Sequence, residues 1–343
     1  MKFAPTIINW YQSNKRDLPW RHTKDPYKIW ISEIILQQTR VNQGLKYYLK
    51  FIDHFPNVAK MAQASEDEIL KLWQGLGYYS RARNLHATAK NIYKNHNNTF
   101  PDNYKDLLKL KGVGPYTAAA IASFAYNEAQ AVVDGNVYRV LSRYYGIYTP
   151  INSTEGQKEF ANLAQDLIDK KHASTYNQAI MEFGAIQCKI KQVDCESCPL
   201  KNSCKSYASK LQDSLPIKIK KTKIRHRYFD YFILSHNNKY QLQQRLEKDI
   251  WNKLYQFPLM ESESFVEEKN IMKTDWWNEN IPEGSQITNI KTAKIHKLSH
   301  QHIHARFWYI KTPEKTNIAQ CINVAEDRLE SYAVPKLIAD YLP

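Results

Sequence analysis

The most constraining feature of this 343-residue chain is a group of four cysteines confined to 17 residues. Four thiolates this close in sequence can surround one metal centre, and both zinc and a [4Fe–4S] cluster accept four cysteines. Zinc sites usually carry two short C-x2-C knuckles, whereas this loop carries one. The loop therefore predicts a metal centre instead of disulfides. The spacing is C-x6-C-x2-C-x5-C, at Cys188, Cys195, Cys198 and Cys204.

Charge and composition narrow the class of partner. The chain holds 48 Lys and Arg against 34 Asp and Glu, a formal net charge of +14. This excess favours a polyanion, because each neutralised phosphate releases counterions, although a basic protein with another role has the same balance. The first residues lack the apolar core of a signal peptide, and the longest apolar run, 117–126, is too short for a membrane helix. We expect a cytoplasmic protein with no membrane partner.

The pattern of apolar and polar residues along the chain predicts two domains of different structural class. Residues 1–206 carry apolar side chains at steps of three and four, which is typical of helices. Residues 207–227 are polar and basic, and strand-like runs follow at 228–234, 240–244 and 305–310, with a closing helix at about 334–341. The prediction is a mainly α N-terminal domain, a basic linker and an α+β domain over 228–343.

Two glycines in the string L-K-G-V-G-P-Y-T-A, residues 110–118, precede an Ala-rich helix. Gly112 and Gly114 permit positive φ and a close backbone approach, and the free N–H groups that open the next helix can bind a phosphate. A G-x-G turn between two packed helices has the same signature. The string therefore indicates a helical hairpin that could hold nucleic acid.

Two carboxylates have the surroundings that acid–base chemistry needs. Glu33 lies in the helical string W-I-S-E-I-I-L, where apolar neighbours should remove water and raise its pKa. Asp134 precedes Gly135 and a helical run, so we expect an N-cap whose N–H groups lower the pKa of the carboxyl. One carboxyl with a raised pKa and one with a lowered pKa suit the cleavage of a glycosidic bond. Each residue taken alone could equally be an ordinary helix residue.

Taken together, the cysteine spacing, the 110–118 string and the run 133–140 resemble the helix–hairpin–helix DNA glycosylases of the endonuclease III superfamily. The string around Glu33 is similar to the adenine DNA glycosylase signature, and the resemblance covers essentially the whole chain. It implies one [4Fe–4S] cluster, a six-helix barrel module at about 25–130, an iron–sulfur module from 1–24 and 131–206, and a Nudix-like 8-oxoguanine recognition domain over 228–343.

The resemblance also implies roles for single residues. Glu33 would protonate adenine N7, and Asp134 would stabilise the oxocarbenium ion or form a covalent intermediate. Asn136 would orient Asp134 or the attacking water. Tyr116 stands where the related lyases have a lysine, and a hydroxyl forms no imine, so the enzyme would be monofunctional. The DNA contacts would involve Trp20, Arg21, Gln38, Tyr78, Gly112, Gly114, Lys189 and Lys191, with Glu182 supporting the structure.

In the C-terminal region, the string W-N-K-L-Y-Q-F-P at 251–258 carries the Nudix resemblance, but the R-E-x-x-E-E box of Nudix hydrolases is missing, which predicts no pyrophosphohydrolase activity. Ser299 and His300 are the nearest match to the family's Phe-Ser-His loop and would read 8-oxoguanine. Four histidines between His296 and His304 indicate either a metal site or exposed strand residues. Cys321 lies apart and is expected to be buried.

The resulting hypothesis is a monomeric base excision repair enzyme that acts on double-stranded DNA. It would remove adenine opposite 8-oxoguanine or guanine and so prevent G:C to T:A mutations. One alternative is a pyrimidine glycosylase/lyase of the same fold, which Tyr116 and Glu33 oppose. The other is a non-catalytic iron–sulfur nucleic-acid binder, which the Glu33 and Asp134 pair opposes.

Overall fold

The structure is a computed structural model that describes residues 2–219 and 224–343, so the centre of the basic linker, residues 220–223, lies outside it. The chain forms two compact units. Of the described residues, the first unit comprises 2–63 and 84–219, and the second comprises 64–83 and 224–343. No helix in the described ranges is long and apolar enough to span a membrane.

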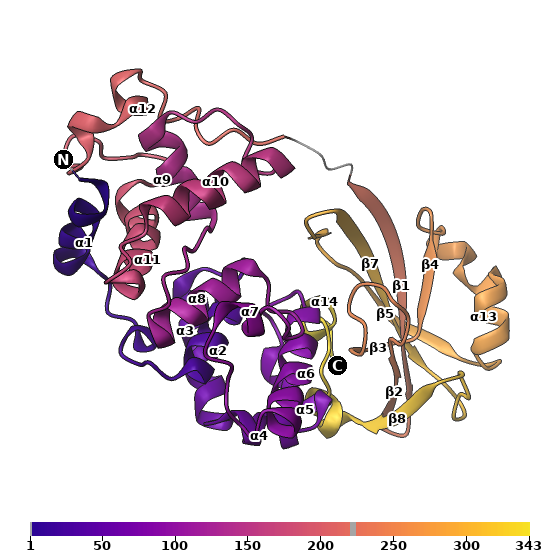
Figure 1. The fold of residues 1–343 in the computed structure, drawn as a ribbon. Helices are drawn as coiled ribbons and strands as arrows, with labels where there is room; N and C mark the ends of the chain where they lie inside the picture. The colour runs from indigo at the N-terminus through magenta and orange to yellow at the C-terminus, as the bar shows by residue number, and fades with distance from the viewer. Residues whose placement is uncertain (1, 220–223) are drawn as a thin grey trace. The chain divides into compact units, whose positions relative to one another are not determined.

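The first unit is helical, as its sequence predicts (Figure 1). A π-helical turn, Phe183–Gln187, follows α11 and leads into the cysteine loop. The helices are α1 (Phe3–Asn14), η1 (Pro19–Arg21), α2 (Pro26–Leu36), α3 (Val41–His54), α4 (Val58–Gln63), α6 (Ser80–Asn95, which begins in the second unit), α7 (Tyr104–Leu107), α8 (Pro115–Tyr126), α9 (Gly135–Tyr145), α10 (Thr154–Leu167), α11 (Ala173–Glu182) and α12 (Lys205–Ala208).

Two central helices explain how this unit holds together. The Asp25 side chain caps α2 by accepting from the Tyr27 N–H, and Pro26 supplies the fixed φ of a first helical residue. Eight of the eleven residues of α2 are buried. Helix α8 packs against α2, and its residues 117–120 are small and buried, which favours a close approach of neighbouring backbones. Glu33 on α2 and Tyr116 on α8 are thereby held on neighbouring helices.

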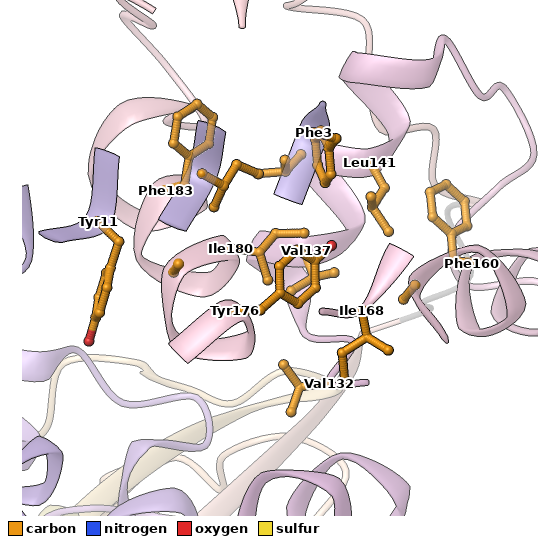
Figure 2. Packing of buried hydrophobic residues seen from close by; sticks show 14 of the residues in the cluster. Phe3, Tyr11, Val132, Val137, Leu141, Phe160, Ile168, Tyr176, Ile180 and Phe183 are labelled. Carbon is orange, nitrogen blue, oxygen red and sulfur yellow. The ribbon is translucent and has the colours of Figure 1, made fainter. Parts of the chain in front are cut away.

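The N-terminal helix packs with the segment that precedes the cysteine loop. Phe3 and Tyr11 of α1 join a core formed by α9, α10 and α11, including Val137, Phe160 and Tyr176 (Figure 2). Residues at the two ends of the first unit thus share one apolar core. This core fixes the start of α9, where Asp134 lies.

The second unit is built on an eight-stranded mixed sheet with the central order β3-β2-β1-β7-β5. Strand β4 also pairs with β1, β6 with β7, and β8 with β2, and the three strand-like runs of the sequence fall on β1, β2 and β7. The elements are α5 (Glu66–Trp73), β1 (Arg225–His236), β2 (Lys239–Gln244), β3 (Tyr255–Gln256), β4 (Leu259–Ser262), η4 (Glu268–Lys273), α13 (Asp275–Asn280), β5 (Gln286–Thr292), β6 (His296–Lys297), β7 (Gln301–Lys311), β8 (Cys321–Ala325), η5 (Glu326–Ser331) and α14 (Lys336–Ala339).

Strands β1 and β7 pair in parallel at the centre of the sheet, and both faces of this pair are covered. One face buries Tyr231 and Phe307 together with residues of η5 and α14, and the other buries Phe232 and Trp308 with residues of η4 and α13. Burial on both faces explains why these strands read as nearly continuous apolar runs. The predicted α+β class is confirmed, whereas the grouping of residues 64–83 with this unit has no signal in the sequence.

A buried ion pair fixes the register between the two central strands. Asp230 is fully buried and accepts from Arg306 Nε at 2.8 Å and from Trp308 Nε1 at 2.8 Å. We expect Asp230→Ala to lower the free energy of unfolding by about 3–5 kcal/mol, because it leaves the Arg306 charge buried and unpaired. Urea unfolding followed by tryptophan fluorescence measures this loss. Glu279→Ala, at an exposed position of α13, is the matched control, and equal losses in both variants would contradict the prediction.

Candidate active site

A cavity of about 400 Å³ opens in the first unit, within the range of about 300–1,000 Å³ that small-molecule sites occupy. Its walls come from η1, α2, the start of α8, the start of α9 and α11. The predicted site residues that line it are Trp20, Arg21, Glu33, Gln38, Tyr116, Asp134 and Asn136. Three chain segments far apart in sequence therefore bring the expected catalytic groups to one cavity.

Glu33 is buried, with 5% of its surface exposed, and Tyr116 Oη donates to Glu33 Oε2 at 2.6 Å. The pKa of Glu33 is raised to about 7, chiefly by burial and also by the nearby Asp134 charge, while the Tyr116 hydrogen bond and Arg21 oppose the shift. The predicted rise in pKa is confirmed. A carboxyl that is half protonated near neutral pH can give up a proton within the cavity.

Asp134 forms the predicted N-cap of α9. Its Oδ1 accepts from the backbone N–H groups of Asn136 and Val137, both at 2.8 Å, and its Oδ2 accepts from Asn136 Nδ2 at 2.8 Å. The expected fall in its pKa is wrong. Loss of hydration around the carboxyl is the largest influence and raises the pKa of Asp134, although the hydrogen bonds from Val137 and Asn136 oppose it.

Arg139 connects this cap to the cysteine loop. Its Nη2 donates to Asn136 Oδ1 at 2.9 Å and to the Gly184 carbonyl at 2.5 Å, and its Nε donates to the Cys188 carbonyl at 2.8 Å. The bond to Asn136 Oδ1 turns the amide nitrogen toward Asp134. Asn136 thus has a fixed orientation that both Arg139 and Asp134 determine.

Glu182 lies on the cavity wall, which the sequence analysis did not predict. Arg16 donates to it from Nε at 2.8 Å and Nη2 at 2.7 Å, and Arg21 Nη2 donates at 2.6 Å. Burial alone would raise the pKa of Glu182, but the bonds from Arg16 and Arg21 outweigh it and lower the pKa to about 2. Arg21 is therefore bonded to Glu182 and not directly to Glu33. Trp20 lines the cavity and packs edge-on against Tyr48.

The hairpin glycines have the geometry that a close backbone approach requires. Gly112 has φ +75°, and a Cβ there would lie 2.6 Å from Asn84 Cβ, so no other residue fits without a shift. Gly114 is the N-cap of α8, with Pro115 at the first helical position. The N–H groups of the first turn of α8 are thus free of intrahelical partners, as at any helix start.

A second cavity, of about 320 Å³, lies within the second unit. Its lining includes Tyr78, Trp251, Ser299 and His300. Tyr78 is 53% exposed in a left-handed backbone conformation with φ 47°, and the Ser299 Oγ and His300 Nδ1 atoms lie 3.2 Å apart. Gln38 belongs to the first unit and is exposed there.

The four cysteines Cys188, Cys195, Cys198 and Cys204 line one small cavity of about 30 Å³. Arg143 Nη1 donates to Cys188 Sγ at 3.5 Å. In residues 2–219 and 224–343, no three His, Cys, Asp or Glu side chains already converge on an ion-sized position. A set of four thiols around one cavity fits a tetrathiolate group in donor chemistry. Cys321 is partly buried on β8 and lies in the other unit.

The helical fold, the hairpin and the cavity with two carboxyls define a helix–hairpin–helix DNA glycosylase that carries a Nudix domain. Residues 31–168 match the HhH-GPD superfamily of base excision DNA repair proteins, and residues 230–343 match the NUDIX domain. An adenine DNA glycosylase of Buchnera aphidicola (strain Bp) is 40% identical over 87% of this chain and 83% of its own length. The chain belongs to the adenine DNA glycosylase family.

Other relatives agree. An adenine DNA glycosylase of Arabidopsis thaliana is 35% identical over 75% of this chain and 47% of its own length. Among solved structures, a thermostable thymine-DNA glycosylase is similar, with a TM-score of 0.56 and 33% identity over 60% of this chain and 95% of that chain. An endonuclease III–DNA complex, at 20% identity and a TM-score of 0.53, shares the fold. The protein is thus an N-glycosylase of base excision repair.

Proposed function

We propose that this enzyme hydrolyses the N-glycosidic bond of adenine mispaired with 8-oxoguanine or guanine, with Glu33 as general acid and Asp134 as the stabilising carboxylate. The observation that carries the proposal is the meeting of Glu33, Tyr116 and Asp134 on one base-sized cavity. It acts as a monomer on double-stranded DNA in the cytoplasm, and so prevents G:C to T:A mutations.

The first step of the chemistry follows from the raised pKa of Glu33, which keeps a proton available near neutral pH. Glu33 transfers its proton to N7 of the extruded adenine, which lets the base leave with the electron pair of the C1′–N9 bond. The deoxyribose becomes an oxocarbenium ion, and the Asp134 carboxylate stabilises its charge or forms a covalent bond to C1′. Water then adds at C1′, displacing Asp134 if that bond has formed, and passes its proton to the Glu33 carboxylate. Asn136 holds Asp134 in place during this step. Trp20, Arg21 and the ion-paired Glu182 form the remaining walls around the base.

We assign recognition of the opposite base to the second cavity. Ser299 and His300 offer hydroxyl and imidazole groups that can donate to and accept from the edge of 8-oxoguanine. Tyr78 and Gln38 would occupy the gap in the base stack and offset an unstacking cost of a few kcal/mol. Gly112 and Gly114 hold the phosphate backbone at the start of α8, and Lys189 and Lys191 add charge from the cysteine loop.

We assign one structural [4Fe–4S] cluster to Cys188, Cys195, Cys198 and Cys204. These four thiolates would hold the cluster, which would serve there as a structural cross-link of the loop. Arg139 and Arg143 of α9 hold the start of this loop, because Arg139 donates to the Cys188 carbonyl and Arg143 donates to Cys188 Sγ and to the Lys189 carbonyl. Iron analysis and visible absorbance test the assignment: wild type should hold four irons per chain, and Cys198→Ser should lose them, whereas Cys321→Ser should retain them. Iron retained in Cys198→Ser, or zinc in the wild type, would overturn it.

Single-turnover assays on three duplexes of identical flanking sequence test the substrate. We expect adenine release from A opposite 8-oxoguanine and from A opposite guanine, and none from an oxidised pyrimidine. Ser299→Ala combined with His300→Ala should slow release opposite 8-oxoguanine more than opposite guanine. Equal slowing on both duplexes would contradict the role of the second cavity, and release of the oxidised pyrimidine would contradict the proposed substrate.

The presence of Tyr116 predicts that the enzyme removes the base without cutting the DNA strand. Its hydroxyl cannot form a Schiff base with the sugar, so borohydride should trap no more enzyme–DNA complex than it traps with Tyr116→Phe. Tyr116→Lys places an amine at the same position of α8 and should increase trapping. Gel analysis of the trapped complexes measures both. Strong trapping by the wild type would show that this chain is a lyase.

A further inference from the structure

We propose that His226, His302 and His304 form a binding site for a divalent transition-metal ion of the zinc class. These residues, which we call the three-histidine cluster, lie on β1 and β7 of the second unit. They belong to neither of the two cavities assigned above nor to the cysteine loop.

The parallel register of β1 and β7 brings the three rings to one face of the sheet. His226 lies opposite His302, and Tyr228 lies opposite His304. Residues two apart on a strand project from the same face, so His302 and His304 share the face of His226. The cluster occupies the first residues of both strands, before that face becomes apolar core at Phe232 and Trp308.

The two ring distances that involve His226 match those of a metal site. The centroid of the His226 ring lies 5.3 Å from that of His302 and 5.2 Å from that of His304. A tetrahedral ion with N–metal bonds of about 2.0–2.1 Å places two ligand-ring centroids roughly 5 Å apart. His226 Nδ1 and His304 Nε2 already lie 2.9 Å from each other and would need to separate by a few tenths of an ångström.

The three donors do not yet converge on a single point in the described parts of the chain, so binding requires the rings to rotate. His226 is exposed, and His302 and His304 are partly exposed. The imidazole rings can therefore rotate without displacing core residues. Tyr228 stacks on His304 at a centroid distance of 4.5 Å and supports one face of that ring. Water can complete the coordination shell from the open side.

The contact between His226 and His304 favours a cation over a phosphate. An N···N hydrogen bond at 2.9 Å needs one nitrogen to accept, so at least one ring is neutral and carries a free lone pair after rotation. Two positive rings, which would suit a phosphate, cannot make this bond. Imidazole donors select zinc, copper and nickel over magnesium and calcium. Lys297 lies opposite His302 and adds positive charge, which limits the affinity.

Equilibrium dialysis of the full chain against zinc, with no histidine tag and with iron content matched between samples, tests the proposal. Wild type should bind one more zinc ion than His304→Ala. His226→Ala or His302→Ala should weaken that site by at least about tenfold, the loss that even an outer-shell partner of a metal site causes. His236→Ala, on β1 but outside the cluster, should bind like wild type. All variants keep the four cysteines, so the differences report the cluster alone.

A second measurement keeps the test independent of folding. Zinc should raise the thermal unfolding midpoint of wild type and leave that of His304→Gln unchanged, while both proteins release adenine at the same rate in chelator. Equal zinc uptake by wild type and His304→Ala, or by wild type and His302→Ala, would overturn the proposal. The proposal would also be overturned if the histidine variants took up as much zinc as wild type but bound DNA more weakly in chelator. That result would make the cluster a phosphate contact.

Discussion

Glu33→Gln should lower the single-turnover rate of adenine release by about 10²–10⁴-fold, the usual contribution of a positioned general acid. Glutamine keeps the size of the side chain and can still accept from Tyr116, but it has no proton to give to the base. Because Glu33 has a raised pKa of about 7, the wild-type rate should fall as pH rises through that value. Rates measured between pH 5.5 and 9 test both statements.

A control variant distinguishes the role of the Glu33 proton from that of the hydrogen bond between Tyr116 and Glu33. Tyr116→Phe removes the bond that lowers the pKa of Glu33, so the alkaline limb of the rate profile should move to higher pH. Glu33→Gln should also be more resistant to heat than wild type at pH 8. A carboxyl whose pKa is raised by folding makes the folded protein less stable as pH rises through that pKa, and glutamine carries no such charge. A Glu33→Gln rate close to wild type, or a flat wild-type profile, would disprove the role of Glu33.

Asp134→Asn should reduce the rate by about 10²–10³-fold, the cost of removing one preorganised electrostatic group from a developing charge. Asparagine is as good an N-cap as aspartate, so α9 should remain folded while the negative charge beside the sugar is lost. Single-turnover rates at saturating enzyme measure the chemical step, and a binding titration with the same duplex checks that DNA affinity persists.

Asp25→Asn is the matched control for this variant. Asp25 caps α2 by accepting from the Tyr27 N–H, as Asp134 caps α9, but it does not line the cavity. Its rate should stay at the wild-type value. If the two asparagine variants slow adenine release equally, the effect belongs to helix capping and Asp134 has no special part in the chemistry.

Local signals in the sequence were enough for much of this site. The apolar neighbours of Glu33 predicted its burial and raised pKa, and Asp134 before Gly135 predicted an N-cap. Periodicity indicated that residues 1–206 are mainly helical, and it located the strands β1, β2 and β7. In each case the property depends on residues within about two helical turns, which a sequence displays directly.

Properties that depend on distant partners were not predicted. The pKa of Asp134 rises because the assembled fold removes water, an effect absent from the cap motif itself. Glu182 lines the cavity because Arg16 and Arg21, which lie 166 and 161 residues away in sequence, hold it there. His226 meets His304 across 78 residues, and nothing in the spacing of the four nearby histidines indicates this partner.

The parallel pairing of β1 with β7 has a consequence for how the protein is made. β1 is complete at residue 236, yet its long partner strand begins at residue 301, so one edge of β1 stays unpaired while the intervening chain is synthesised. Unpaired apolar edges promote aggregation, and non-local strand pairing slows folding. Chains that terminate between these two strands would therefore be captured by chaperones or precipitate, even though their active-site cavity is already encoded.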